Sequence, residues 1–236
     1  MIILFTRYYM YKRYLSILLL SFVLLPLCAF SAYPELEGTW MVNWRGDYIW
    51  RVYSEQKPTE EGQRRLDKYN VLVDDPSLYC IPSGVGRLWD EPDTLWRLEQ
   101  YDDRVEIHYE IFDLKRVINL NQKNHPIDFI PSTTDINGNY IENLGHSIGW
   151  YDGDTLVIET LGFTESYITT LGTNVFPQSQ ALRSIERISM VEDNISLEIS
   201  YFDPILMTAP LNVSYIYIPS QYEFSVYGCI PKDGEH

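Results

Sequence analysis

The chain has 236 residues, of which 45% are hydrophobic, 14% are aromatic and 22% are charged. This composition is typical of a globular protein with a substantial core, and it excludes disordered and collagen-like chains. There are 33 acidic residues against 18 basic ones, which gives a formal net charge of −15. Nucleic acids and anionic membrane surfaces should repel so acidic a chain. We therefore expect no nucleic-acid partner.

Residues 1–31 have the order of a secretory signal peptide: a basic start, an apolar run over Leu15–Phe30, and small residues at the cleavage spacing. We expect an exported protein, periplasmic or secreted, whose mature part begins at Ala32. After cleavage of the signal, no stable insertion into a membrane is expected. Three alternatives stay open: an uncleaved membrane anchor, translation from Met10 instead of Met1, and a lipoprotein attached through Cys28.

Two cysteines belong to the mature chain, Cys80 and Cys229. An oxidising compartment permits a disulfide between them. The bridge would close a very long loop, which the chain-entropy model values at about 4 kcal/mol. It would also hold a C-terminal tail that has few other anchors. Two buried free thiols are the alternative.

Strand signals dominate the mature chain, because Tyr, Trp and Phe are interleaved with Val, Ile and Thr. Most of the predicted strands are joined in pairs by tight turns, some of them with strong hairpin residues such as Asp-Gly. The predicted strands are Thr39–Trp44, Tyr48–Tyr53, Leu95–Gln100, Val105–Phe112, Leu114–Leu120, Ser147–Trp150, Thr155–Thr160, Leu182–Val191, Ile195–Phe202, Leu211–Ile218 and Tyr222–Val226. Such a meander usually closes on itself to remove its edges. We therefore predict an all-β fold with one domain over residues 32–236, a single antiparallel up-and-down barrel of lipocalin-like architecture.

One short surface helix is predicted over Thr59–Tyr69. Thr59 can cap it, acidic residues lie in its first turn, and basic residues follow. The segment is polar almost all round, so it should lie on the surface. Long rim loops are expected over Asn70–Pro92, Asn121–Asn143 and Gly162–Gln180, and loops of this length often carry function.

Two glycine-rich motifs are better explained by structure than by chemistry. Gly145–Gly149 matches the G-x-S-x-G pattern of a nucleophile elbow, but it leads into a turn rather than a helix. We therefore expect that Ser147 is not a nucleophile. Gly84-Val85-Gly86 has no predicted helix after it and does not make a nucleotide-binding fingerprint. The four histidines lack ligand spacing, so we expect no metal site and no cofactor.

Charged residues in one predicted strand indicate a candidate site. Glu186 shares a face with Leu182 and Ile188, so we expect its carboxylate to point into the core or a cavity, while Arg183 and Arg187 share the opposite face. Whichever face turns inward brings a charge with it, and a lone buried charge is unfavourable unless it is paired. The candidate catalytic residues are Glu186, His146, Arg116 and Arg187, and the candidate ligand-binding residues are Glu110 and Arg183. The alternative is a structural ion pair or a network at the rim of the barrel.

Several blocks of the chain resemble a family of exported, mostly uncharacterised bacterial proteins. Asp75–Arg87 is similar to its D-P-x-x-x-C-x-P-x-G block, and Gly145–Thr160 to its G-x-S-x-G-x-W-x-G-D-T-L-V-V-x-T signature. Ser179–Arg187 is similar to its S-x-A-L-R-x-x-E-R block, although Gln178 stands where the family often has His. The resemblance covers nearly the whole mature chain. It implies export, a β-rich fold and a Cys80–Cys229 disulfide, and it implies no activity.

Two classes of function fit these features. The first is a barrel that binds a small hydrophobic or aromatic molecule in its cavity, which the aromatic content and the long loops favour. The second is a cofactor-free isomerase, lyase or cyclase in the same cavity, in which Glu186 moves a proton and an Arg or His stabilises developing charge. Buried partners of Glu186 facing an open cavity would favour the enzyme. A third possibility, an envelope interaction module, requires an exposed apolar patch.

Overall fold

The structure is a computed structural model that describes residues 33–43, 51–52, 57–91, 93–170 and 174–232. The chain divides into two compact units, Met1–Ala32 and Tyr33–His236. The first unit, which contains the predicted signal peptide and Cys28, lies outside the described residues. In the part of the chain that is described, no helix is long and apolar enough to cross a membrane.

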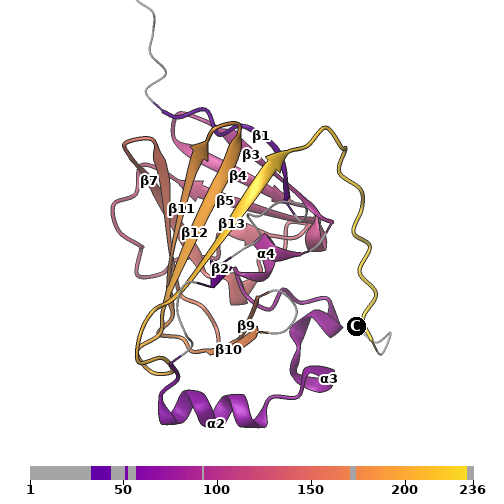
Figure 1. The fold of residues 1–236 in the computed structure, drawn as a ribbon, viewed down its shortest axis with the longest axis vertical. Coiled ribbons are helices and arrows are strands. Elements are labelled where there is room, and N and C mark those ends of the chain that lie inside the picture. The colour runs from indigo at the N-terminus through magenta and orange to yellow at the C-terminus, as the bar shows by residue number, and fades with distance from the viewer. Residues whose placement is uncertain (1–32, 44–50, 53–56, 92, 171–173, 233–236) are drawn as a thin grey trace, which may run out of the picture. The chain divides into compact units, whose positions relative to one another are not determined.

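Nine strands of the second unit close into a barrel (Figure 1). They follow one another around the barrel in chain order, and the last strand pairs with the first. The nine strands are β1 (Gly38–Val42), β3 (Leu95–Gln100), β4 (Arg104–Tyr109), β5 (Leu114–Asn119), β7 (His146–Asp152), β8 (Thr155–Leu161), β11 (Arg183–Val191), β12 (Asn194–Phe202) and β13 (Leu211–Pro219). Closure satisfies both edges of the sheet, and the prediction of a mostly β barrel is confirmed.

The barrel is not purely antiparallel, because its strand number is odd. Strand directions can alternate around a closed ring only when the number of strands is even, so nine strands require at least one parallel pair. That pair is β5 with β7, which meet at Asn119 and Ile148. The other neighbours around the ring are antiparallel. The prediction of a wholly antiparallel up-and-down barrel is therefore wrong in this respect.

Three predicted hairpins are confirmed with nearly the expected strands: β3 with β4, β7 with β8, and β11 with β12. The predicted turn at residues 45–47 lies outside the described residues, and both β1 and β2 (Arg51–Val52) pair with β13. The predicted strand Tyr222–Val226 is wrong, since residues 220–232 form neither helix nor strand. The cause is topological: β12 occupies one side of β13, and β1 and β2 occupy the other.

The predicted long loops contain short elements. β6 (Thr133–Thr134) pairs with β5, and β9 (Ser166–Thr170) forms a separate two-stranded sheet with β10 (Asn174–Gln178). The described residues of these loops also form the single-turn 3₁₀ helices η1 (Pro76–Tyr79) and η3 (Glu142–Leu144), the latter at the end of its loop. A further 3₁₀ turn, η2 (Ile111–Asp113), lies between β4 and β5, where the predicted strand Val105–Phe112 ends early. The single predicted helix is confirmed as α2 (Glu60–Lys68), but α3 (Val71–Asp74) and α4 (Arg87–Asp90) join it.

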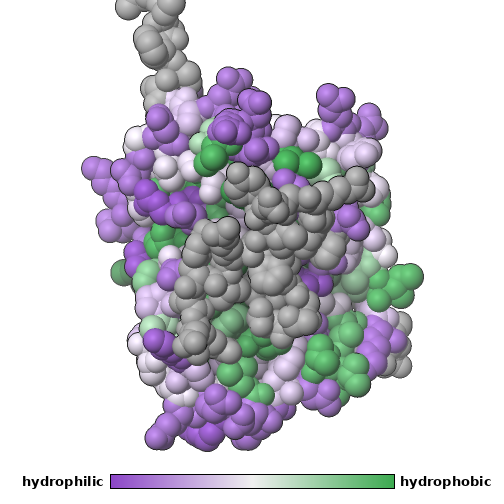
Figure 2. All heavy atoms as spheres, viewed as in Figure 1, coloured by the Kyte–Doolittle hydropathy of each residue, from purple (hydrophilic) through white to green (hydrophobic). Residues whose placement is uncertain are grey.

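The short helices α3 and α4 differ in what they bury. Figure 2 shows hydrophobic residues gathered at the lower right, over α3, where Val71, Leu72 and Val73 are each more than half exposed. In α4, by contrast, Leu88, Trp89 and Asp90 are all buried. The helix therefore contributes to the hydrophobic core of the barrel and not to its surface.

The position of α2 is determined by contacts at its N-terminus. The Thr59 hydroxyl accepts a hydrogen bond from the Gly62 amide at 3.0 Å and donates to the Ile205 carbonyl at 2.7 Å. Gly62 is the buried residue of this helix. A Cβ at Gly62 would overlap the carbonyl oxygen of Leu206. The helix is thus held against the segment that connects β12 to β13.

We expect Gly62→Ala to lower the stability of the protein, although Ala normally favours a helix over Gly by about 1 kcal/mol. The reason is that the new methyl group would force α2 away from the Leu206 backbone. Thermal melts should show a lower Tm for Gly62→Ala and an almost unchanged one for Lys68→Ala, an exposed position in the same helix. A Gly62→Ala protein with a raised Tm would contradict this packing.

Candidate functional site

Glu186 lies in β11 and points into the barrel, where its side chain is completely buried. Ser184 and Ile188 share the inward face and are also buried. Arg183 and Arg187 lie on the outward face and are more than two-fifths exposed. The inward direction of Glu186 agrees with the strand pattern read from the sequence.

Arg116 reaches Glu186 from β5, on another side of the barrel, and is almost equally buried. Its Nη1 donates to Glu186 Oε1 at 3.1 Å, and its Nη2 donates to Oε2 at 2.6 Å. The remaining N–H groups donate to the Ser147 hydroxyl at 3.0 Å, to the Thr160 hydroxyl at 2.7 Å and to the Tyr109 hydroxyl at 3.5 Å. All five N–H donors of the guanidinium therefore have an acceptor.

Trp89 of α4 completes the surroundings of the carboxylate. Its indole Nε1 donates to Glu186 Oε1 at 2.6 Å. Its ring meets those of Trp96 and Tyr109 edge to face, with centroids 5.2 Å apart in each case. The Tyr217 hydroxyl donates to the Trp89 carbonyl at 2.5 Å. We call the six residues of this network the buried cluster: Tyr109, Arg116, Ser147, Thr160, Glu186 and Trp89.

The electrostatics of the buried cluster favour a permanent ion pair. Burial alone would lower the pKa of Arg116, but the adjacent Glu186 carboxylate outweighs burial and raises that pKa. Burial raises the pKa of Tyr109 far above its ordinary value, so this hydroxyl stays protonated. Neither Arg116 nor Glu186 lines any of four outer pockets found among the described residues. The geometry is that of a structural ion pair.

The G-x-S-x-G motif serves this cluster. Ser147 lies in β7, and the motif runs from the 3₁₀ helix η3 into a strand, not from a strand into a helix. The Ser147 hydroxyl accepts from Arg116 and shares a 3.0 Å hydrogen bond with the Thr160 hydroxyl. The arrangement lacks the strand–turn–helix elbow in which the G-x-S-x-G motif presents a nucleophilic serine. Near Gly84-Val85-Gly86, however, the expectation of no following helix is wrong, because α4 begins at Arg87.

Four of the six candidate residues lie outside the buried cluster. Arg187 forms an ion pair with Asp152 at 2.8 Å, and Arg183 forms one with Glu159. Both pairs are on the outer surface. His146 and Glu110 belong to two further groups, one around a second histidine and one around the C-terminal segment. Of the predicted residues, the structure therefore brings together only Glu186 and Arg116, and their roles stay predictions.

His146 forms a pair with His125, a residue that the sequence analysis did not single out. The two Nδ1 atoms are 2.8 Å apart, and the Phe129 ring lies against His146 with centroids 5.4 Å apart. Burial, with a smaller effect of His125, lowers the pKa of His146 to about 4. Burial also lowers the pKa of His125, although Glu159, 3.8 Å from its Nε2, acts in the opposite direction. Both rings are therefore neutral at pH 7.

Glu110 anchors the C-terminal segment, residues 220–232, which we call the strap. Glu110 Oε1 accepts from the amide and the hydroxyl of Ser225 at 2.7 and 2.8 Å, while Oε2 accepts from the Leu95 amide at 2.9 Å. Asp113 accepts from the Tyr227 amide at 3.1 Å. Two carboxylates at the end of β4 and in η2 thus hold the middle of the strap.

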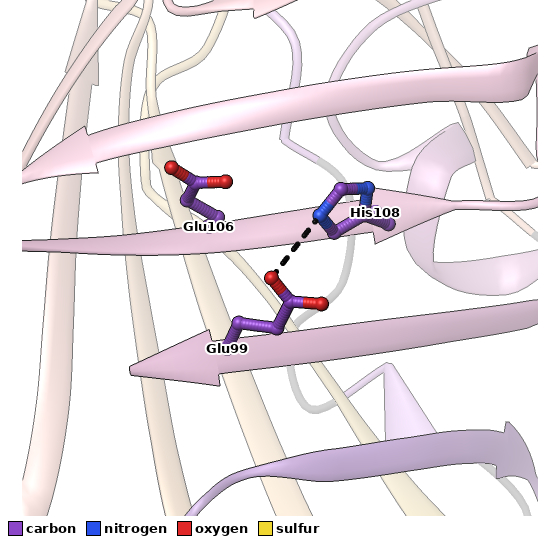
Figure 3. A group of neighbouring side chains, drawn as sticks. All are labelled: Glu99, Glu106 and His108. Atoms are coloured by element: carbon purple, nitrogen blue, oxygen red, sulfur yellow. Dashed lines mark ion pairs between the residues drawn. The ribbon is translucent and has the colours of Figure 1, made fainter. Parts of the chain in front are cut away.

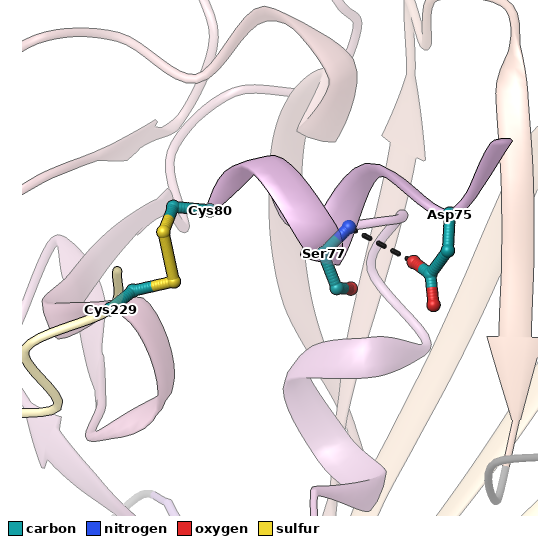
Figure 4. Close-up of a disulfide and its surroundings, with 4 residues drawn as sticks. All are labelled: Asp75, Ser77, Cys80 and Cys229. Carbon is teal, nitrogen blue, oxygen red and sulfur yellow. Dashed lines mark hydrogen bonds between the residues drawn. A yellow bond between two sulfur atoms is a disulfide. The ribbon is translucent and has the colours of Figure 1, made fainter. Parts of the chain in front are cut away.

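A disulfide holds the far end of the strap. Cys80 and Cys229 are bonded, with 5.8 Å between their Cα atoms and 149 positions between them in the chain. Figure 4 shows that Cys80 lies at the end of η1, whose start is capped by the Asp75 carboxylate accepting from the Ser77 amide at 2.9 Å. The Lys232 amide donates to the Leu78 carbonyl at 2.8 Å. The predicted disulfide is confirmed.

A pocket of about 750 Å³ lies between the strap and the outer face of the barrel. We call it the strap pocket. Strands β1, β3, β4 and β5 form its floor, and the strap and the segment after β6 form its walls. Its lining includes Arg97, His108, Lys115, Ile136, Tyr222 and Phe224. The guanidinium of Arg97 lies over the Phe224 ring, 5.2 Å from its centroid.

Beside this pocket, three side chains on the outer face of β3 and β4 resemble a metal-ligand set. The residues are Glu99, Glu106 and His108 (Figure 3). Each offers one potential ligand atom, and these three atoms all lie within 4.8 Å of one another. His108 Nε2 is 3.7 Å from Glu99 Oε2. Burial lowers the pKa of His108, although Glu99 acts in the opposite direction, so the ring is neutral at pH 7.

Cations of the chain already neutralise these carboxylates. Glu106 accepts from Arg104 at 2.7 Å and from Lys115 at 2.5 Å. Glu99 pairs with Arg97 at 3.1 Å. Three positive side chains therefore face two carboxylates, and a divalent cation would have to displace them. The group is better explained as a surface ion-pair network than as a metal centre.

We expect Glu186→Gln to lower the free energy of unfolding by about 3–5 kcal/mol, because the buried Arg116 charge would lose its counter-charge. The double variant Arg116→Met/Glu186→Leu should regain most of that loss, since it removes both charges and keeps apolar volume. Chemical denaturation of both variants measures the difference. An unchanged midpoint for Glu186→Gln would show that the carboxylate has no structural role.

The histidine pair should make stability depend on pH. The pKa of His146 is about 4 in the folded protein and 6.5 ordinarily, so the unfolded chain binds more protons between these values. The free energy of unfolding should therefore fall as the pH decreases from 6.5 to 4, by about 2–3 kcal/mol from this residue. In melts across this range, His146→Gln should show a weaker pH dependence than the wild type. Parallel profiles for the two proteins would contradict the lowered pKa.

Comparisons with known proteins give no match to this chain. No family model matches it. No curated protein and no solved structure matches it either. A functional assignment therefore depends on the residues and the geometry described above.

Proposed function

We propose that this protein is an exported binding protein for a small hydrophobic or aromatic molecule, and that the ligand lies in the strap pocket. The observation that carries the proposal is the pocket itself, whose volume of about 750 Å³ is typical of small-molecule sites. Five aromatic or aliphatic side chains line it beside a larger set of polar and charged ones, and such a mixture can hold and orient a small organic molecule. The five are Tyr109, Leu114, Ile136, Tyr222 and Phe224.

The packing around Trp89 inside the barrel supports this location. Lipocalin-like barrels of small strand number hold ligands inside when the interior is open. Here α4 enters the core, and Trp89 packs on Trp96 and Tyr109 while its indole is bonded to Glu186. A ligand in that place would have to displace a buried helix. The strap pocket needs no such rearrangement.

Export is supported by the intramolecular disulfide, which persists in oxidising compartments and is rare in reducing ones. The closed barrel is compatible with the lipocalin-like architecture that we infer from the sequence. The order of residues 1–31 favours a secretory signal over a lipoprotein attached through Cys28. These three features together favour a periplasmic or secreted carrier.

The contacts of Glu186 do not favour the enzymatic alternative. A general base must reach a proton of the substrate, directly or through one water. Glu186 Oε1 accepts hydrogen bonds from both Arg116 and Trp89, and Oε2 accepts one from Arg116. The side chain is also completely buried. A cofactor-free isomerase or lyase built on this residue would need the buried cluster to open.

We expect Phe224→Ala to weaken binding of the neutral aromatic fluorophore phenylnaphthylamine by about tenfold, because one aromatic wall of the pocket is lost. Phe202→Ala is a matched control: its ring also lies beneath an arginine, Arg183, with 5.5 Å to the centroid, and it lines none of the four outer pockets. Fluorescence titration measures both affinities.

Equal affinities for Phe224→Ala and Phe202→Ala would show that the fluorophore binds elsewhere. No binding to the wild-type protein, at any concentration that stays soluble, would count against a hydrophobic small-molecule site. Thermal melts of both variants ensure that a loss of affinity is not a loss of folding.

A further inference from the structure

We propose that the strap is a redox-controlled cover of the strap pocket. The Cys80–Cys229 disulfide holds the strap over a bound ligand, and reduction of this disulfide releases both the strap and the ligand. The inference rests on the proposed function for the ligand, but the release of the strap itself can be measured without one.

The strap is attached to the barrel by few non-covalent contacts. Tyr222, Val226 and Ile230 are each about three-quarters exposed or more. Pro231 is the buried residue of the strap. The described anchors of the strap are hydrogen bonds of Ser220, Ser225, Tyr227 and Lys232, the Arg97 guanidinium over the Phe224 ring, and the Tyr227 ring beside that of Phe112. A segment without regular structure that is held by such scattered contacts opens at a low free energy.

The disulfide is placed where it controls this opening. One end of the strap continues β13, and the other end is bonded through Cys229 to Cys80. The pocket-lining residues Tyr222–Ser225 lie between these two covalent attachments. As Figure 1 shows, the yellow C-terminal segment spans from the end of β13 toward the region of α3 and α4. Opening the disulfide leaves a chain that is covalently attached at one end only.

The bond is accessible to a thiol reagent, because Cys80 and Cys229 are both only partly buried. A dithiol reductant, chemical or enzymatic, attacks one sulfur as a thiolate and forms a mixed disulfide. Its second thiol then displaces that sulfur. In the balanced reaction two electrons and two protons pass to Cys80 and Cys229, which become thiols, and the reductant becomes a disulfide.

Release of the strap removes one wall of the pocket. Tyr222, Phe224 and Ser225 supply aromatic surface and polar groups on the side away from the barrel. The remaining floor on β3, β4 and β5 carries the charged side chains Arg97 and Lys115. A hydrophobic ligand should therefore bind the oxidised protein more tightly than the reduced one. The protein would hold its ligand in an oxidising compartment and release it on reduction.

The test compares the full oxidised chain with the Cys229→Ser variant, which lacks the disulfide without any reagent. Hydrogen–deuterium exchange should show much faster exchange of peptides from the strap in Cys229→Ser, with little change in β7, β8, β11 and β12. Phenylnaphthylamine should bind the variant about tenfold more weakly. A dithiol reductant should change the wild type in the same way and leave Cys229→Ser unchanged, which controls for other effects of the reagent.

Each outcome separates the two proposals. Equal rates of hydrogen–deuterium exchange in the strap with and without the disulfide would overturn the proposal that the disulfide holds the strap in place. A freed strap with unchanged affinity would overturn the coupling of redox state to release, while the proposed binding function would stand. Failure of the oxidised wild type to bind the fluorophore would instead count against the proposed function, and the exchange result would still decide whether the strap is held by the disulfide.

Discussion

The ion pair between Arg116 and Glu186 is the constraint on which the rest of the structure depends. Two charges in a closed barrel are tolerated only if every donor and acceptor is satisfied. Satisfying them requires strands β4, β5, β7, β8 and β11 and the helix α4 at one level of the barrel. A buried pair adds little net stability compared with apolar residues, but it opposes any shift in strand register that would leave a charge alone.

This constraint moves the candidate binding site to the outside of the barrel. Trp89 reaches Glu186 from α4, so this helix lies in the core and occupies part of the barrel interior. The ring of strands closes with β1 against β13, so both edges of β13 are already paired. The chain that follows Pro219 therefore finds no free strand edge to join. It continues instead as the strap, across the outer face of β1, β3, β4 and β5. The contact of Trp89 with Glu186 thus accounts for α4 inside the barrel, and closure of the ring accounts for the path of the strap outside it.

Local signals in the sequence predict the parts of the fold that local interactions determine. Turn residues predict the hairpins of β7 with β8 and β11 with β12, and the residues around Thr59 predict α2. Strand alternation predicts that Glu186 points inward and needs a partner. The choice of Arg116 depends on the register of non-adjacent strands, which no local pattern contains.

Other features lacked a signal of their own. A four-residue helix such as α4 is too short to show a helical period in its sequence. It also ends with a charged residue, Asp90, which normally indicates a surface position but is buried here. His125 lies in a predicted loop, and its partner His146 lies 21 positions later, at the start of β7. The strap pocket joins the C-terminal tail to strands more than a hundred residues earlier in the chain. Only the disulfide, predicted from two cysteines in a chain expected to be exported, indicated that the tail is held.

The most direct test of the central claim is to map where a ligand binds. Amide chemical shifts of the oxidised protein, recorded by NMR with increasing phenylnaphthylamine, report this location residue by residue. We expect the shifts to concentrate at His108, Lys115 and Tyr222–Ser225, with little change at Trp89, Ser147 and Thr160. Shifts concentrated instead at Trp89, Ser147 and Thr160 would contradict the claim, since they would show that the barrel interior opens to receive the ligand.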